Sequence, residues 1–384
     1  MLFANVTKIG TVQPFAEPVY VTRPILPPLE KMSALLGEVW EAGWLTNSGM
    51  QQKALEQRLQ NFLAVPHLSL FSSGTTALMV AIRALGISGE VITTPFTFPA
   101  TPHALFWNNL PVVFADVDPD SMNLAPEAIE AAVGPNTAAI LPVHVFGTPC
   151  DWEAIEDIAA RHNLRVIYDA AHAFGTEIGS VPVGALGDVS MFSFHATKTF
   201  HTAEGGALST KDPELKARFD LLRNFGIQDE TTVSMPGLNG KMNELQAALG
   251  LLVLDMLKEE QGKRAVLKRI YEQWFKPVDG IHLVSDRPGV KGSYQYVAIR
   301  IDKERFGRSR DEVYDRLREH NVIARKYFAP LCSELPHFKM LQSASAANLP
   351  VANRVASEIL CLPVYGALPP ESVEKICEII VGAN

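Results

Sequence analysis

Cysteine is scarce in this sequence and gives no metal or disulfide pattern. The 384 residues include four cysteines, which stand singly: Cys150, Cys332, Cys361 and Cys377. Zinc sites use closely paired cysteines, and small disulfide-rich domains need a much higher density of them. We therefore expect four reduced thiols, buried in the core as free cysteines commonly are.

Long hydrophobic runs are also absent. No stretch approaches the roughly 20 apolar residues that a transmembrane helix needs. The first 24 residues, MLFANVTKIGTVQPFAEPVYVTRP, lack the basic end, apolar centre and small-residue cleavage site of a secretory signal. We expect a cytoplasmic protein with no membrane role.

Basic residues are in the minority. The chain has 34 Lys and Arg against 42 Asp and Glu, which gives a net charge of −8. Because nucleic-acid-binding proteins usually present a basic surface, we expect no nucleic-acid partner. The sequence also lacks a G-x-G-x-x-G motif after an early strand and a Walker lysine motif, which counts against a nucleotide-binding oxidoreductase.

Between about residues 65 and 210, apolar segments typical of buried strands alternate with amphipathic segments typical of helices. The apolar segments are VITTPFTF, PVVFADVD, AAILPVHVFG, RVIYDAA, VSMFSFHA and GGALST. This alternation predicts an α/β fold in which a parallel sheet is covered by helices on both faces. Ligands of such sheets bind at the carboxyl ends of the strands.

A long helical pattern separates this region from a second one. Residues 243–275 are rich in strong helix formers and contain no proline, which predicts a connecting helix. Beyond about residue 280, strand-like and helix-like segments are mixed. We predict an N-terminal arm (1–30), a large α/β domain (31–255), and the connecting helix with a small C-terminal α+β domain (256–384).

The segment SSGTTALMVAIRALG, residues 72–86, predicts a helix with Ser72, Ser73, Gly74 and Thr75 at its entry. Unpaired backbone N–H groups, the helix dipole and a glycine that allows close approach form a site of phosphate size. The same residues are also common helix caps. The motif alone leaves both interpretations open.

The segment RVIYDAAHAFG, residues 165–175, places Asp169 directly after an apolar strand. A carboxylate there faces the edge of the sheet where ligands bind. Alone, Asp169 could equally cap the next segment or accept a hydrogen bond from a loop amide. His172 alone is more typical of a hydrogen-bonded core histidine than of a catalytic group.

The segment SFHATKTFHTAEGGA, residues 193–207, contains one lysine, Lys198, in an apolar setting. Phe192, Phe194 and Phe200 flank it, whereas an ordinary surface lysine lies on a polar face. Two glycines follow and permit tight packing beside a bulky ligand. We assign no chemical role to Glu204.

One ligand explains the three segments together. It carries a phosphate for the helix entry, a basic nitrogen that pairs with a buried carboxylate, and a carbonyl carbon that forms a Schiff base with lysine. These are the features of pyridoxal 5′-phosphate (PLP). Burial favours the uncharged amine that this reaction needs, and the carboxylate keeps the pyridine nitrogen protonated so that the ring accepts electrons.

Five segments also resemble a known family. SSGTTAL, TPFTFPAT, DAAHAFG, SFHATKTFHTAEGGAL and GLNGKMNELQAALG are similar, in this order, to motifs of the DegT/StrS family of PLP-dependent nucleotide-sugar aminotransferases. The resemblance covers nearly the whole chain. It implies PLP fold type I, as in aspartate aminotransferase, with a mostly parallel seven-stranded sheet flanked by helices and a smaller C-terminal α+β domain.

The resemblance implies roles for individual residues. Lys198 is the Schiff-base lysine and proton shuttle, Asp169 pairs with the pyridine nitrogen, and His172 lies beside the ring or its phenolic oxygen. The other expected cofactor-binding residues are Gly74, Thr75 and Ser193 at the phosphate, Phe98 stacked on the ring, and Asn239, which reaches the phosphate in the neighbouring subunit. The position of Asn239 thus implies a homodimer with shared active sites.

The family also implies substrates. Its members usually take nitrogen from L-glutamate and transfer it to a nucleotide-linked keto-deoxysugar, for surface polysaccharides such as O-antigen. The strings GWLTN, LPVHVFG and DAAHAFG most resemble the branch that aminates dTDP-4-keto-6-deoxyglucose to dTDP-4-amino-4,6-dideoxyglucose. A 3-keto sugar or a UDP or GDP carrier stays open as an alternative.

There are two alternative interpretations of the function. Some family members are sugar dehydratases in which histidine replaces the Schiff-base lysine, and Lys198 argues against that reaction. A PLP-binding protein with a regulatory role and no catalysis is the alternative from another class. The presence of Lys198, Asp169 and Ser193 together argues against it.

Overall fold

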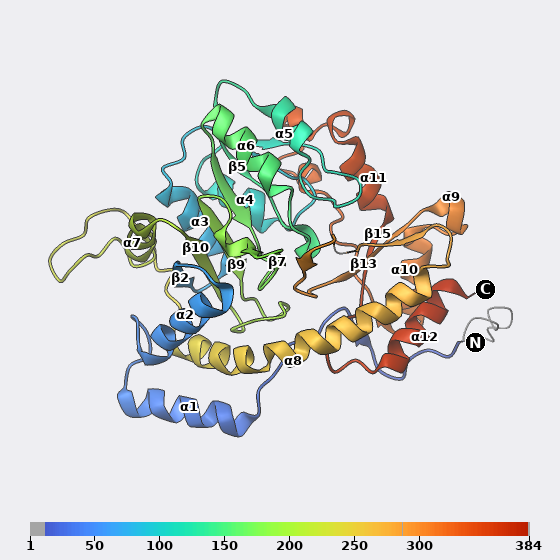
Figure 1. The fold of residues 1–384 in the computed structure, drawn as a ribbon, viewed down its shortest axis with the longest axis horizontal. Helices are drawn as coiled ribbons and strands as arrows, with labels where there is room; N and C mark the ends of the chain where they lie inside the picture. The colour runs from blue at the N-terminus through green and yellow to red at the C-terminus, as the bar shows by residue number, and fades with distance from the viewer. Residues whose placement is uncertain (1–11, 286, 383–384) are drawn as a thin grey trace.

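The computed structural model describes residues 12–285 and 287–382. Figure 1 shows a large body built around a sheet, a smaller body at the C-terminal end, and helix α8 (Glu244–Phe275) running beneath both. Four cysteines are buried and unpaired, as expected. Among the described residues, no helix is both long and apolar enough to cross a membrane, and a cytoplasmic location stays a prediction.

The large body contains the predicted seven-stranded sheet. In spatial order its strands are β2 (His67–Phe71), β10 (Gly206–Thr210), β9 (Val189–Ser193), β6 (Arg165–Asp169), β5 (Thr137–Leu141), β3 (Glu90–Thr93) and β4 (Val112–Phe114). Only β10 runs against the others, because it pairs antiparallel with both β2 and β9. The prediction of a mostly parallel sheet is confirmed.

Helices cover both faces of this sheet, as the apolar strands require. One face packs against α3 (Gly74–Ala84), α4 (Ala100–Trp107) and α7 (Pro213–Leu222). The other packs against α2 (Met50–Leu63), α5 (Pro126–Ala132), α6 (Trp152–His162) and the first part of α8. In β6, neighbouring residues alternate between the two faces: Ile167 packs in the first core, and Val166 and Tyr168 pack in the second.

Helix α8 begins at a capping box. The Asn243 side chain accepts a hydrogen bond from the Gln246 backbone N–H (2.9 Å), and the Gln246 side chain accepts one from the Asn243 N–H (3.1 Å). These two bonds satisfy N–H groups that a helix start leaves unpaired. The helix then runs unbroken to Phe275, as the sequence predicted. Since it passes residue 255 without interruption, the domain boundary there stays a prediction.

The smaller body is an α+β unit. Strands β11 (Ile281–Leu283), β13 (Val297–Ile301) and β15 (Ile359–Leu362) form an antiparallel sheet that packs with α10 (Arg310–Glu319), α12 (Pro370–Val381) and the end of α8. Shorter elements complete the fold: β1 (Val19–Tyr20), α1 (Leu29–Ala42), β7 (Glu177–Ile178), β8 (Val181–Pro182), β12 (Val290–Lys291), α9 (Lys303–Phe306), β14 (Val322–Ile323) and α11 (Pro350–Glu358).

The predicted N-terminal arm (1–30) stays a prediction, and the structure describes only part of these residues. Residues 12–28 contain no helix, and β1 within them pairs in parallel with β14 of the smaller body. Residues 1–11 lie outside the described residues. The arm therefore joins the smaller body before the chain enters α1.

Candidate active site

The carboxyl ends of the sheet strands gather the residues that the sequence singled out. Strands β6 and β9 are parallel neighbours that end at Asp169 and Ser193, and Lys198 follows five residues after β9. On the far side of β10, β2 leads directly into α3, whose first residue is Gly74. The topology thus brings the three motifs to one edge of the sheet.

Asp169 is a buried carboxylate, 4% exposed. Its two oxygens accept hydrogen bonds from the Thr101 hydroxyl (2.9 Å) and the Ala171 backbone N–H (3.0 Å). Burial raises the pKa of Asp169 above its ordinary value, while the two hydrogen bonds and the charge of Lys198 act in the opposite direction. The raised pKa means that a further positive charge beside this carboxylate would stabilise its ionised form.

Lys198 is half-buried, close enough to Asp169 for the two charges to interact. Burial lowers the pKa of its amine to about 8, and the attraction to Asp169 opposes this only in part. At pH 7 about a tenth of the amine is therefore uncharged, far more than for an ordinary lysine. An uncharged amine is the form that attacks a carbonyl carbon.

His172 is 4% exposed and enclosed by aromatic rings. Its ring stacks on Phe328 (centroids 5.8 Å apart) and meets the edge of Tyr296 (5.1 Å), both from the C-terminal part of the chain. Burial, followed by the charge of Lys198, lowers its pKa well below the ordinary value, so the ring is neutral. Its Nδ1 has no hydrogen-bond partner among the described residues.

The start of α3 forms a backbone cradle. Ser73 is the helix cap and accepts a hydrogen bond from the Thr76 N–H (3.1 Å), which leaves Gly74 and Thr75 as the first two helical residues. A Cβ on Gly74 would lie 2.9 Å from that of Ser193, and a Cβ on Gly206 would lie 2.7 Å from the Gly74 Cα. The Ser73 cap therefore does not exclude the predicted phosphate site, which stays a prediction, and both glycines are needed for this close packing.

Phe98 and Asn239 have exposed side chains. Phe98, 58% exposed, precedes α4, and its carbonyl oxygen accepts a hydrogen bond from the N–H of Thr101 (3.2 Å). Asn239 lies between α7 and α8, and its side-chain oxygen accepts a hydrogen bond from Lys241 (3.0 Å). The cofactor contacts predicted for these two residues stay predictions.

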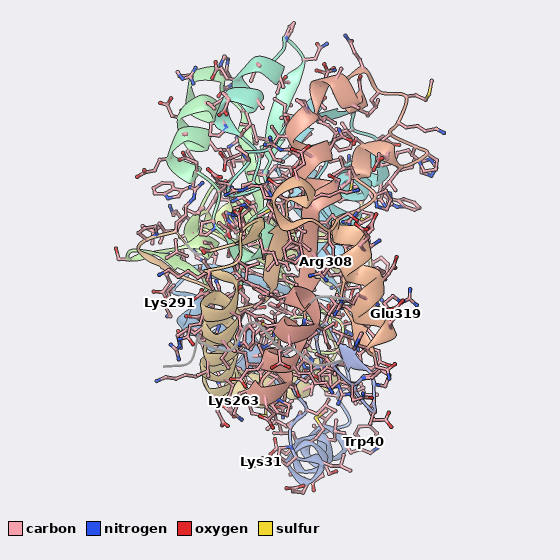
Figure 2. All side chains as sticks on the ribbon, turned by 90° about the vertical axis from the view of Figure 1, so that its right-hand side faces the viewer. Lys31, Trp40, Lys263, Lys291, Arg308 and Glu319 are labelled. Atoms are coloured by element: carbon pink, nitrogen blue, oxygen red, sulfur yellow. The ribbon has the colours of Figure 1, made fainter. Side chains whose placement is uncertain are left out.

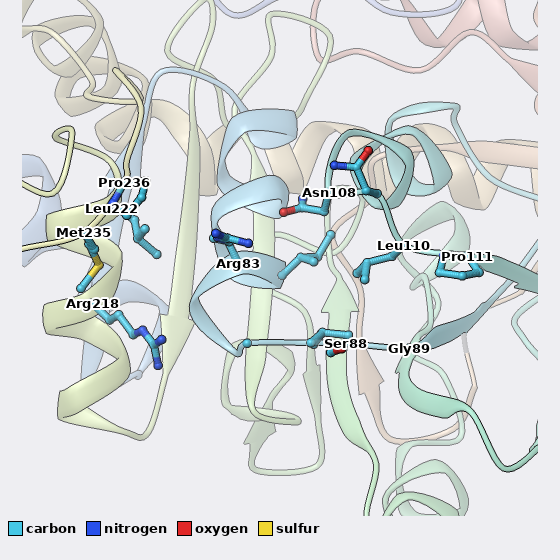
Figure 3. Close-up of a pocket in the computed structure, with 14 residues that line it drawn as sticks. Arg83, Ser88, Gly89, Asn108, Leu110, Pro111, Arg218, Leu222, Met235 and Pro236 are labelled. Atoms are coloured by element: carbon cyan, nitrogen blue, oxygen red, sulfur yellow. The ribbon is translucent and has the colours of Figure 1, made fainter.

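A separate groove lies away from these residues. The groove has a volume of about 600 Å³. Its lining includes Arg83, Ser88, Asn108 and Arg218, which are labelled in Figure 3. Gly89 and Pro111, which also line it, stand just before β3 and β4. The groove therefore opens at the amino ends of the parallel strands, the opposite edge from Asp169, and is not the catalytic site.

Sequence reasoning missed several residues of the site. Thr101 contacts Asp169, Phe328 and Tyr296 contact His172, and Gln295 contacts the loop of Lys198. Thr101 ends the segment TPFTFPAT, which had drawn attention for Phe98 alone. The other three come from a region whose sequence shows no signal of chemistry.

Comparison with known proteins decides the family. The model of the DegT/DnrJ/EryC1/StrS aminotransferase family matches residues 29–381. The chain belongs to this family. The prediction made from its motifs is confirmed, and the chain is a PLP-dependent aminotransferase.

Relatives of this aminotransferase cover nearly its full length. It is 44% identical to the dTDP-4-amino-4,6-dideoxy-D-glucose transaminase of Escherichia coli, over 94% of this chain and 98% of that protein. The spore coat polysaccharide biosynthesis protein SpsC of Bacillus subtilis is 32% identical, over 89% and 92%. The crystal structure of DesI with its TDP-sugar product matches with a TM-score of 0.91 and 35% identity, over 96% of this chain and 93% of that one.

The geometry of the aminotransferase site fits PLP. The buried Asp169 calls for a positive charge, which the protonated ring nitrogen supplies. The unpartnered Nδ1 of His172 is free to bond a polar atom of the cofactor. The start of α3, beside Ser193, suits the phosphate, and the amine of Lys198 suits the aldehyde.

Proposed function

We propose that this aminotransferase moves an amino group from L-glutamate to the 4-keto group of dTDP-4-keto-6-deoxyglucose, giving dTDP-4-amino-4,6-dideoxyglucose. The observation that carries the proposal is the 44% identity to the E. coli dTDP-4-amino-4,6-dideoxy-D-glucose transaminase, which extends over 98% of that protein. The similarity to DesI, crystallised with its TDP-sugar product, supports a thymidine carrier.

Each residue of the site has its own role in the proposed reaction. Bound PLP supplies a carbonyl carbon for the amino group and an electron-withdrawing ring. Asp169 pairs with the protonated ring nitrogen of the cofactor at the buried end of the site. His172 is neutral, so its Nδ1 can bond a polar atom of the cofactor without adding a charge. Gly74 and Thr75 offer backbone N–H groups, and Ser193 a hydroxyl, to the phosphate.

Lys198 moves the protons. An amine with a pKa of about 8 both accepts and releases a proton near neutral pH. Its Nζ takes up the proton that leaves the α-carbon of the amino donor. It then delivers a proton to the sugar carbon that receives the nitrogen.

We also propose that the enzyme works as a homodimer with shared active sites. Exposed apolar side chains occur on α1 and the loop after it, at Trp40 (65% exposed), Trp44 and Leu45. Figure 2 shows Trp40 on α1 at one end of the molecule. Such a concentration of large apolar surface is typical of a protein interface.

The loop between α7 and α8 supports the sharing of sites. Figure 1 shows it leaving the large body as a long excursion, and Phe225, Ile227 and Val233 on it are exposed. At its base the Gly240 carbonyl accepts a hydrogen bond from the Ser72 N–H (2.8 Å), just before the phosphate cradle. In the proposed dimer, a partner docked on this loop lends its own Asn239 to the cradle.

A substrate panel tests the proposed reaction. The PLP-loaded enzyme is incubated with ¹⁵N-labelled L-glutamate and dTDP-4-keto-6-deoxyglucose, and NMR locates the new amine. We expect ¹⁵N on C4 of the sugar with the wild-type enzyme and none with Lys198→Ala.

Matched substrates separate the alternatives. Faster amination of a 3-keto sugar, or of a UDP or GDP sugar, would overturn the substrate but keep the aminotransferase. Transfer from glutamine and not from glutamate would overturn the donor. An enzyme that binds PLP and aminates none of the sugars from either donor would support the regulatory alternative.

A further inference from the structure

A short loop before β13 reaches from the smaller body to the loop of Lys198. Two of its side chains, Ser293 and Gln295, are almost fully buried, at 2% and 3% exposed. Between them Tyr294 has a φ of 54°, a left-handed conformation that turns the chain locally. Strand β13 accordingly begins only at Val297.

Gln295 bonds to both neighbours of Lys198. Its side-chain oxygen accepts hydrogen bonds from the Thr199 backbone N–H (2.6 Å) and the Thr199 hydroxyl (2.9 Å). Its side-chain nitrogen donates to the Thr197 carbonyl oxygen (2.9 Å). One amide group thus bridges the peptide backbone before and after the lysine.

The orientation of this amide is fixed by its partners. A backbone N–H only donates and a carbonyl oxygen only accepts, so a flipped Gln295 would face Thr199 N–H with its own NH₂ group and the Thr197 carbonyl with its own oxygen. Both contacts would then be repulsive. Because the amide is buried, water is poorly placed to replace the lost bonds.

Ser293 bonds to the second motif from the same loop. Its hydroxyl donates to the His172 carbonyl oxygen (2.6 Å). Gly147 lies against both groups, since a Cβ there would meet the Ser293 hydroxyl at 2.5 Å and the His172 carbonyl oxygen at 2.8 Å. The loop before β13 therefore contacts the site at two points, the loop of Lys198 and the backbone of His172.

We propose that Gln295 is a positioning residue that holds the Lys198 amine in its half-buried place beside Asp169. It acts through the backbone on both sides of the lysine and links that backbone to the smaller body. The proposal rests on the proposed function in taking Lys198 as the reacting amine. A purely structural Gln295 would stabilise the fold and leave the chemistry of that amine unchanged.

The pKa of the Lys198 amine distinguishes a positioning role of Gln295 from a purely structural one. Burial lowers the pKa of Lys198 to about 8. If the loop of residues 197–199 loosens, water reaches the amine and its pKa rises toward the ordinary lysine value of about 10.4. A rise of one unit lowers the uncharged fraction at pH 8 from about one half to about one tenth, roughly a fivefold decrease.

The test compares full-length, cofactor-free wild type and Gln295→Met. Methionine keeps the length of the side chain and removes all three hydrogen bonds. Both proteins are treated briefly with isotopically labelled acetic anhydride between pH 6.5 and 10.5, and mass spectrometry quantifies acetylation of the peptide that contains Lys198. We expect Gln295→Met to titrate at higher pH and to be acetylated about fivefold more slowly at pH 8.

Tyr271→Phe is the matched control. It also removes one buried hydrogen bond to a backbone carbonyl, from the Tyr271 hydroxyl to Pro363 (3.0 Å), away from the lysine loop. We expect its Lys198 titration to match that of wild type. If Gln295→Met does not fold, Thr199→Val, which removes the hydroxyl bond alone, should show a smaller shift in the same direction.

A folded Gln295→Met protein whose Lys198 titrates as in wild type would overturn the proposal. So would an equal shift in Tyr271→Phe. Because the labelling needs neither PLP nor sugar, its outcome is independent of the substrate panel. A shifted titration in an enzyme that aminates no sugar would keep the positioning role and reject the proposed function.

Discussion

At the residue scale, Asp169 and Lys198 form an unusual pair. An exposed Asp and Lys would both be fully charged at neutral pH, but here burial raises the pKa of the acid and lowers that of the amine. Burial thus works against charge on both groups, and their mutual attraction offsets it only in part. The site is consequently suited to a ligand that brings its own positive charge.

The pKa of Lys198 predicts how cofactor capture depends on pH. Only the uncharged amine attacks the aldehyde, so the rate of PLP incorporation into the cofactor-free enzyme should rise with pH. Well below pH 8 it should increase about tenfold per unit, and above pH 8 it should level off. Stopped-flow absorbance between pH 6.5 and 9.5 measures this rate, and an increase that continues to pH 10 would show an ordinary, exposed lysine.

The candidate site residues that closely follow strands could be predicted from the sequence. Those that come from distant parts of the chain could not. Asp169 and Lys198 could be identified because each stands close after an apolar strand, where parallel sheets bind ligands. Gln295 lies 97 residues beyond Lys198, in a loop with no chemical motif. Its role depends on tertiary packing, which no local pattern encodes.

At the element scale, the strongest periodic patterns gave the most accurate predictions. The strands of the large sheet are buried on both faces, so their apolar runs stand out. Helix α8 starts at Glu244 because the side chains of Asn243 and Gln246 cap it there. The smaller body was predicted only as a mixed unit. Strand β14 has two residues, and residues 331–349 contain only short 3₁₀ turns, too brief for a period to show.

At the scale of the whole molecule, the exposed apolar side chains on α1 and on the loop after α7 motivate the proposed homodimer. If Asn239 of one subunit serves the site of the other, two inactive variants should complement each other. Asn239→Ala and Lys198→Ala would place both defects in one site of a mixed dimer and leave the other intact.

Mixing the two variants after mild dissociation should therefore restore about a quarter of wild-type activity, because half of the dimers are mixed at random exchange and each has one intact site. Neither variant alone should reach this level. Sedimentation confirms that dimers re-form. Re-formed dimers without restored activity would show that each site is built from a single chain.

The most direct test of the whole account is to locate the covalent bond to PLP. The full-length enzyme is loaded with PLP, reduced with borohydride, digested and analysed by mass spectrometry. We predict a pyridoxyl group on Lys198 of the wild-type enzyme and none in Lys198→Ala. A pyridoxyl group on another lysine, in an enzyme that still transfers nitrogen from glutamate, would contradict it.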